Sequence, residues 1–204
     1  IGEKLGQRKL ITGTVRQRIP LEGPALNYNS LVILDDSAGL VKYRALYDKF
    51  RLVPFGELPA ARIIPFGWAI SGILPPATQA LARQGFTPGN GPKVIYPDIE
   101  NFPPFVAMIC YEAMFPEIPF EANRAVRADW MVIISADGWF GGWIGPAQHY
   151  AQNRYRSIEA GLPTARVASR GVSAMIDGYG REVVRATPAA GDPEGWRSSI
   201  GRSA

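Results

Sequence analysis

Short apolar runs alternate with turn-rich segments along the first part of the chain. Residues 10–17 alternate apolar and polar side chains, which predicts a strand. Residues 28–34 and 40–44 are two further strand-like runs, and the Asp, Ser and Gly residues between them indicate a turn. We therefore expect a hairpin in this region.

The second half of the chain alternates predicted strands with predicted helices. Residues 105–110 and 130–135 are continuous apolar runs of the kind found in buried strands, and residues 117–127 between them favour a helix. Residues 172–176 and 182–186 flank a Gly-containing turn and predict a second hairpin. This alternation indicates an α/β layered domain.

A second helix is predicted over residues 146–160, where both ends carry a signal. Pro146 suits the first turn of a helix, and Gly161 suits the position just after the last turn. Residues 58–104, in contrast, are rich in proline and longer than an ordinary connection, so we expect a long loop of the kind that forms lids or binding elements.

Composition narrows the class of protein. With 204 residues, of which 47% are apolar, the chain has the size of one ordinary domain and can bury a core. The net charge is +4, but the basic residues are scattered, so we expect no nucleic-acid partner, whereas a membrane surface would suit a mildly basic domain. A single cysteine and a single histidine argue against a disulfide and a zinc site, and we expect no metal or cofactor.

One long apolar segment follows the first predicted strands. Residues 63–82 carry no charge, but Pro and Gly residues interrupt them repeatedly, so we interpret the segment as an apolar loop rather than a membrane-spanning helix. The start of the chain lacks the pattern of a signal peptide. Packing over the core and insertion into a lipid surface are both compatible with this loop.

Cys110 is the first candidate for chemistry. It ends the apolar run 105–110 and precedes a predicted helical turn. Backbone N–H groups at such a junction favour a thiolate and can bind an oxyanion, which is typical of a nucleophile. A buried structural cysteine is the alternative interpretation.

Other candidates are weaker when each is taken alone. Lys49 could stabilise negative charge on a carbonyl oxygen, and Glu57 could accept a proton, although either could be an ordinary surface residue. His149 is the only histidine, yet its place near a helix start favours a packing or hydrogen-bonding role. Asp137 and Trp139 follow a predicted strand, where α/β proteins collect ligand-contacting residues, with an aromatic-rich turn as the alternative.

Six motifs in order carry a family resemblance. They are Tyr28-Asn29-Ser30; Tyr47-Asp48-Lys49 with Pro54-Phe55-Gly56-Glu57; Ile109-Cys110-Tyr111-Glu112; residues 135–141 (Ser-Ala-Asp-Gly-Trp-Phe-Gly); Gly145-Pro146-Ala147-Gln148-His149; and Arg170-Gly171-Val172-Ser173-Ala174. In this order they resemble the nitrilase (carbon-nitrogen hydrolase) superfamily and, within it, the apolipoprotein N-acyltransferases. Ala136 and Gly138 depart from the Asn and Ala common in that family.

The resemblance implies a fold and a set of site residues. It implies a nitrilase-like α-β-β-α sandwich, an α/β fold, over residues 1–187 without its first strands, and a polar tail over 188–204 that leads into a membrane helix. It assigns catalysis to Cys110, Lys49 and Glu57. Four further residues would bind substrate or support these: Tyr111, Glu112, Asp137 and Trp139.

The resemblance also implies a general base that this chain does not supply. The family's base is a glutamate on a strand well before the lysine, and only 48 residues precede Lys49 here. Glu3, in a polar stretch, is a poor substitute. We therefore expect the base to lie upstream of these residues and activity to depend on it.

The implied function is transfer of an acyl chain from a phospholipid to the N-terminal amine of a diacylglyceryl-lipoprotein, through a thioester on Cys110. The implied location is the periplasmic face of a bacterial inner membrane. Two alternatives stay open: a soluble nitrilase-type amidase, and a catalytically degenerate nitrilase-like protein associated with membranes. The motif Pro54-Phe55-Gly56-Glu57 and the apolar 63–82 segment favour the acyltransferase.

Overall fold

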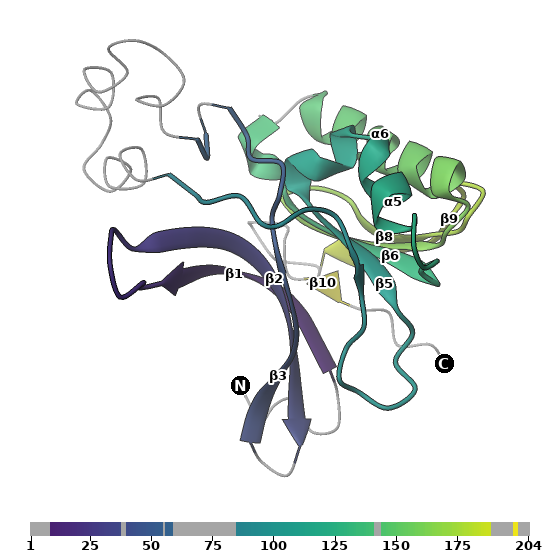
Figure 1. Ribbon diagram of the computed structural model, residues 1–204. Helices are drawn as coiled ribbons and strands as arrows, with labels where there is room; N and C mark the ends of the chain where they lie inside the picture. Colours follow the sequence, from purple (N-terminus) through teal and green to yellow (C-terminus); the bar gives the residue numbers. More distant parts are fainter. Residues whose placement is uncertain are drawn as a thin grey trace. The chain divides into compact units, whose positions relative to one another are not determined.

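Three antiparallel strands form the first sheet (Figure 1). They pair in the order β1-β2-β3, with bounds β1 (Lys9–Arg18), β2 (Leu26–Ser37) and β3 (Leu40–Asp48). The predicted strand and hairpin are confirmed, and the strands run further than the apolar patterns suggested. The β2–β3 register shifts between Ile33 and Leu34, which marks a bulge in the hairpin.

The structure is a computed structural model that describes residues 9–37, 40–54, 56–58, 85–140, 144–188 and 198–199. The chain divides into two units, Ile1–Gly91 and Pro92–Ala204. The apolar 63–82 segment, Glu3 and most of the 188–204 tail lie outside the described residues.

The second unit is built on one mixed sheet. Its strand order is β10-β9-β8-β7-β6-β5-β4, in which the neighbours β5, β6 and β7 are parallel and the remaining pairs are antiparallel. The bounds are β4 (Val94–Ile95), β5 (Phe105–Ile109), β6 (Trp130–Ala136), β7 (Thr164–Ser169), β8 (Ser173–Ile176), β9 (Glu182–Pro188) and β10 (Ser198–Ser199). Strands β5 and β6 and the β8–β9 hairpin were predicted from the sequence, whereas β7 and the short β4 and β10 were not.

Two helices cover one face of this sheet in Figure 1: α5 (Glu117–Ala122) and α6 (Gly145–Ala160). Every residue of β5 is buried, as its continuous apolar run predicted. The main core of the unit joins β5 and β6 to α5, and its fully or nearly fully buried members are Val106, Met108, Ala113, Ile118, Ala122, Ala128, Met131, Ile133 and Leu162.

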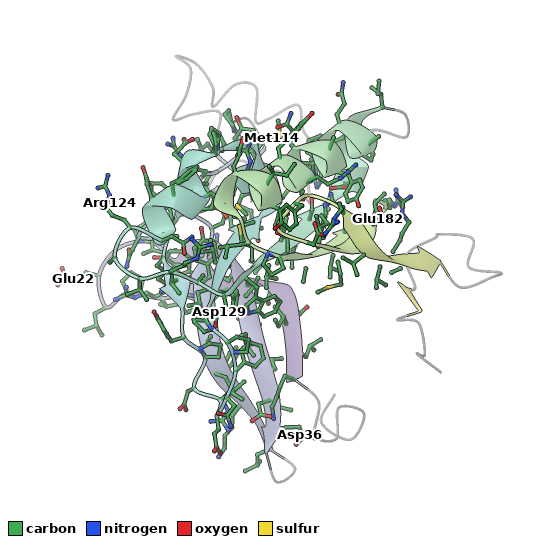
Figure 2. The ribbon with its side chains drawn as sticks, turned by 90° about the vertical axis from the view of Figure 1, so that its right-hand side faces the viewer. Glu22, Asp36, Met114, Arg124, Asp129 and Glu182 are labelled. Atoms are coloured by element: carbon green, nitrogen blue, oxygen red, sulfur yellow. The ribbon has the colours of Figure 1, made fainter. Side chains whose placement is uncertain are left out.

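The C-terminal ends of both helices are set by local interactions. Helix α5 stops at Ala122, earlier than the predicted 117–127, because Asn123 leaves helical geometry and its side chain bonds the Pro119 carbonyl and the Ala128 N–H. Helix α6 ends as predicted, since Gly161 adopts a left-handed conformation with φ of 62°. In Figure 2, Met114 and Arg124 mark the helical side of the unit, and Glu182 marks the start of β9.

Candidate active site

Cys110 occupies a sharp backbone turn at the carboxyl end of β5. It is the first residue of the short 3₁₀ helix η1 (Cys110–Met114) and has a φ of 53°, in the left-handed region that side chains other than glycine seldom adopt. Such a conformation costs on the order of 1–3 kcal/mol and persists only where the surroundings impose it. The buried strand β5 before it and the contacts of η1 after it supply that constraint.

Glu112 ties this turn back to the strand. Its side chain is fully buried, and its Oε2 accepts a hydrogen bond of 2.7 Å from the backbone N–H of Ile109. Tyr111 packs edge-on against Phe115 with ring centroids 4.9 Å apart. Both residues predicted to support Cys110 within its own motif therefore belong to the turn that carries the thiol.

His149 reaches the main chain of Cys110 from helix α6. Its Nε2 lies 3.2 Å from the Cys110 carbonyl oxygen, and its Nδ1 lies 2.9 Å from Oδ1 of Asp137. The ring is 2% exposed, so these contacts lie away from solvent. The contact with a carbonyl oxygen agrees with the hydrogen-bonding role that the sequence favoured for His149.

Asp137 is the centre of a buried polar cluster at the end of β6. It begins the short 3₁₀ helix η2 (Asp137–Phe140), and its carboxylate accepts hydrogen bonds of 2.6 Å from Ser135 Oγ and from Arg166 Nη2. Burial alone raises the pKa of Asp137, but the hydrogen bonds from His149, Arg166 and Ser135 outweigh it and lower the pKa to about 2. Asp137 is therefore ionised at neutral pH.

Arg166 completes the cluster from strand β7. It is 1% exposed, and its Nε donates a 2.6 Å hydrogen bond to Oδ1 of Asn153, while Nη1 donates to the Val172 carbonyl. Asn153 in turn donates to the His149 carbonyl at 2.7 Å. Sequence reasoning missed Arg166 and Asn153; a lone charged residue inside the otherwise uncharged stretch 164–169 was the available signal for Arg166.

Trp139 does not join this cluster. Its side chain is 83% exposed, whereas the adjacent Phe140 stacks at a tilt on His149 with ring centroids 4.8 Å apart. The Trp139 side chain thus faces solvent, and a binding role for it would use this exposed face.

The other predicted pair lies in the first unit. The Lys49 side chain, 1% exposed, follows β3 and places its Nζ 2.7 Å from Oε2 of Glu57. Glu57 also accepts hydrogen bonds of 2.8 Å from Asn29 Nδ2 and from the Val53 N–H. The backbone N–H of Lys49 bonds the Asn29 carbonyl at 2.8 Å, so β2 fixes both members of the pair.

Neither a metal centre nor a membrane span is present in the described part of the chain. No group of three or more His, Cys, Asp or Glu residues described by the structure is arranged to hold a metal ion. None of the described helices is long and apolar enough to cross a bilayer.

The carbon-nitrogen hydrolase family profile matches residues 7–191, a range that includes both Lys49 and Cys110. The chain belongs to the carbon-nitrogen hydrolase (nitrilase) superfamily. The family resemblance read from the six motifs is confirmed by this match.

Curated relatives of this nitrilase-superfamily chain include apolipoprotein N-acyltransferases. The protein of that name from Rhodopseudomonas palustris is 39% identical over 178 residues, which are 85% of this chain and 30% of the relative. The one from Brucella melitensis is 34% identical over 186 residues, which are 89% of this chain and 32% of the relative. The chain thus spans about a third of the length of these relatives.

Solved structures of the superfamily share the fold. A carbon-nitrogen hydrolase from Helicobacter pylori aligns with a TM-score of 0.59 at 19% identity, over 88% of this chain and 58% of that one. Nit3 from Saccharomyces cerevisiae aligns with a TM-score of 0.60 at 19% identity, over 96% of this chain and 60% of that one. The nitrilase-like fold is therefore confirmed, over part of the nitrilase domain.

Proposed function

We propose that this chain is the nitrilase-like part of an apolipoprotein N-acyltransferase, in which Cys110 carries an acyl group between two substrates. The donor is a phospholipid, and the acceptor is the N-terminal amine of a diacylglyceryl-lipoprotein. The single observation that carries the proposal is the 39% identity to an apolipoprotein N-acyltransferase over 85% of this chain.

The geometry of Cys110 supports a nucleophile. Its left-handed turn at the end of a fully buried strand leaves the residue only partly buried, and such strained positions gather at active sites. The thiol follows a strand and begins a helical turn, an arrangement also used by serine nucleophiles on strand-to-helix turns.

In the first step the Cys110 thiol loses its proton to a carboxylate base, and the sulfur attacks the ester carbonyl of the phospholipid. The tetrahedral intermediate collapses, the C–O bond breaks, and the lysophospholipid leaves with the proton from the base. The product is an acyl thioester on Cys110. In the second step the lipoprotein amine attacks that thioester, the C–S bond breaks, and the amine proton returns through the base to the thiol.

Lys49 has the role of stabilising the oxyanion in both tetrahedral intermediates. Glu57, which bonds the ammonium at 2.7 Å, fixes its direction. Tyr111, Glu112, Asp137 and Trp139 are assigned to substrate binding or to support of these groups.

The intact protein, supplied with phospholipid vesicles and no acceptor, tests the proposal. Because Cys110 is the only cysteine of this chain, an acyl adduct in its peptide that hydroxylamine removes identifies the thioester. We expect the adduct and lysophospholipid release in the wild type and neither in Cys110→Ala. An adduct that survives in Cys110→Ala places the nucleophile elsewhere.

The same preparation separates the two alternatives. A nitrilase-type amidase passes its intermediate to water, so it would release ammonia from small amides and leave the lipoprotein amine free. A catalytically degenerate protein would form no adduct with either substrate. Transfer of the labelled acyl chain to a diacylglyceryl peptide, with no ammonia from amides, is the result expected of the acyltransferase.

A further inference from the structure

Both ring nitrogens of His149 face hydrogen-bond acceptors. Nδ1 lies 2.9 Å from a carboxylate oxygen of Asp137, and Nε2 lies 3.2 Å from the carbonyl oxygen of Cys110. Neither acceptor can donate a proton, since a carbonyl has none and Asp137 is ionised at neutral pH. The Cys110 carbonyl can only accept, so a hydrogen bond at this contact requires the N–H on Nε2.

One further contact of the ring competes with this arrangement. Arg166 Nη2 lies 3.4 Å from Nδ1 of His149, a distance at which it could donate to a bare nitrogen. The same Nη2 lies only 2.6 Å from Oδ2 of Asp137, and the carboxylate lies nearer to Nδ1 than the guanidinium does. Asp137 and Arg166 thus flank the Nδ1 side of the ring, and the ring presents Nε2 to the carbonyl of Cys110.

We propose that His149 is a positioning residue that donates a hydrogen bond from Nε2 to the carbonyl oxygen of Cys110 and so holds the main chain of Cys110 in its left-handed turn. The inference rests on the proposed function only in treating Cys110 as the nucleophile. His149 acts on the peptide and not on the sulfur, which distinguishes it from the base of a Cys–His pair. The charged groups around the ring are Asp137 on η2 and Arg166 on β7, and Glu112 lies on η1, which α6 also contacts.

The contacts behind the ring explain why it can hold a strained backbone. Helix α6 carries His149, and Asn153 one turn later bonds both the His149 carbonyl and Arg166. Phe140 packs on the ring face. The imidazole is thus fixed on several sides, and the Cys110 carbonyl is the group it anchors. Released from that anchor, the peptide can relax toward ordinary φ values, and the thiol moves with it.

The protonation of the ring is measured directly by NMR of the intact protein labelled with ¹⁵N-histidine. His149 is the only histidine of this chain, so segmental labelling or comparison with His149→Gln assigns its signals. We expect Nε2 to report a bound proton, as donation to the Cys110 carbonyl requires. A bare, unprotonated Nε2 overturns the proposal. This measurement needs no lipid.

The positioning role is measured by the rate at which iodoacetamide alkylates Cys110. His149→Gln retains an amide donor, whereas His149→Leu retains none. We expect His149→Leu to lower the rate at least about tenfold and His149→Gln to recover most of it, because small displacements of a reacting atom cost large rate factors. The matched control is Gln148→Ala, which changes the exposed neighbour on the same helix and should leave the rate unchanged.

The outcomes separate this proposal from the proposed function. Equal losses in His149→Leu and His149→Gln, with both folded by circular dichroism, contradict a role that depends on the donated hydrogen bond. An unchanged rate in His149→Leu contradicts any positioning role. Alkylation and NMR involve neither phospholipid nor lipoprotein, so failure of the acyl-transfer assay leaves both results standing.

Discussion

The ammonium of Lys49 lies 2.7 Å from Oε2 of Glu57, and the lysine side chain is 1% exposed. A charge so fully removed from water requires a partner, because desolvation otherwise favours the neutral form. Glu57 is itself oriented by Asn29 and by the Val53 N–H. The carboxylate therefore holds the lysine in place in addition to any role in proton transfer.

This pairing predicts an asymmetry between single substitutions. Glu57→Gln should lower the free energy of unfolding by roughly 3 kcal/mol, because it leaves a buried cation without its counter-charge. Lys49→Met should cost less, since Glu57 keeps two donors and is partly exposed. Urea unfolding of both variants and the double variant measures the coupling, with exposed Glu22→Gln as the control. Strictly additive effects would argue against the pair.

The φ of 53° at Cys110 predicts which replacements the turn accepts. Cys110→Val should be less stable than Cys110→Ala by about 1–2 kcal/mol, because a β-branched side chain suffers most in the left-handed region. Cys110→Gly should be tolerated by the backbone, since glycine populates positive φ without steric cost. Chemical unfolding of the three variants measures the order, and equal stability of the valine and alanine variants would contradict a left-handed Cys110.

Elements with a local signal were predictable from the sequence. Strand β5 is a pure apolar run, and α6 begins and ends with the proline and glycine expected at those positions. Strand β7 was missed because Arg166 interrupts its apolar pattern. That arginine is tolerated inside the sheet only because Asp137, Asn153 and the Val172 carbonyl satisfy its donors. Those partners lie on other elements, which no local pattern reveals.

The candidate site likewise combines residues that the sequence indicated with contacts that it did not. Cys110 and Glu112 were indicated by their own motif, and four residues of that motif form one turn. The link from His149 to Cys110 joins residues 39 positions apart and depends on how α6 packs on η1. The bond from Asn29 to Glu57 spans 28 positions and depends on the β2–β3 pairing. Both links are tertiary, so sequence patterns alone do not predict them.

Two glycines near Asp137 should differ in how strongly substitution by alanine destabilises the fold. A Cβ added at Gly171 would lie 2.1 Å from Oδ2 of Asp137, inside the buried cluster, so Gly171→Ala must displace that carboxylate. At Gly138 the nearest atom is Arg170 Cδ at 3.1 Å, which belongs to a flexible side chain that can move. We expect Gly171→Ala to lose about 2 kcal/mol or more and Gly138→Ala well under 1 kcal/mol. Thermal and urea unfolding test the difference, and comparable losses would place the steric constraint elsewhere.

Because Asp137 is ionised in the folded protein, the free energy of unfolding should depend on pH in the acidic range. Its pKa in the folded protein is about 2, below its ordinary value of 3.8, so the folded state favours the carboxylate. Because the pKa is lower in the folded protein, the ionised carboxylate stabilises the fold at pH values above 3.8. This contribution is lost as the pH falls from 3.8 toward 2. The shift corresponds to roughly 2 kcal/mol, most of it lost by about pH 2.

Asp137→Asn isolates this contribution. At neutral pH the variant should be destabilised by about 3 kcal/mol, because Arg166 and His149 lose a buried carboxylate partner. The gap to the wild type should narrow by roughly 2 kcal/mol as pH falls to about 2, since protonation removes the same charge from the wild type. Asp129→Asn, at an exposed position labelled in Figure 2, is the control and should follow the wild-type curve. Unfolding free energies measured across this range would contradict an ionised Asp137 if the Asp137→Asn and wild-type curves ran parallel.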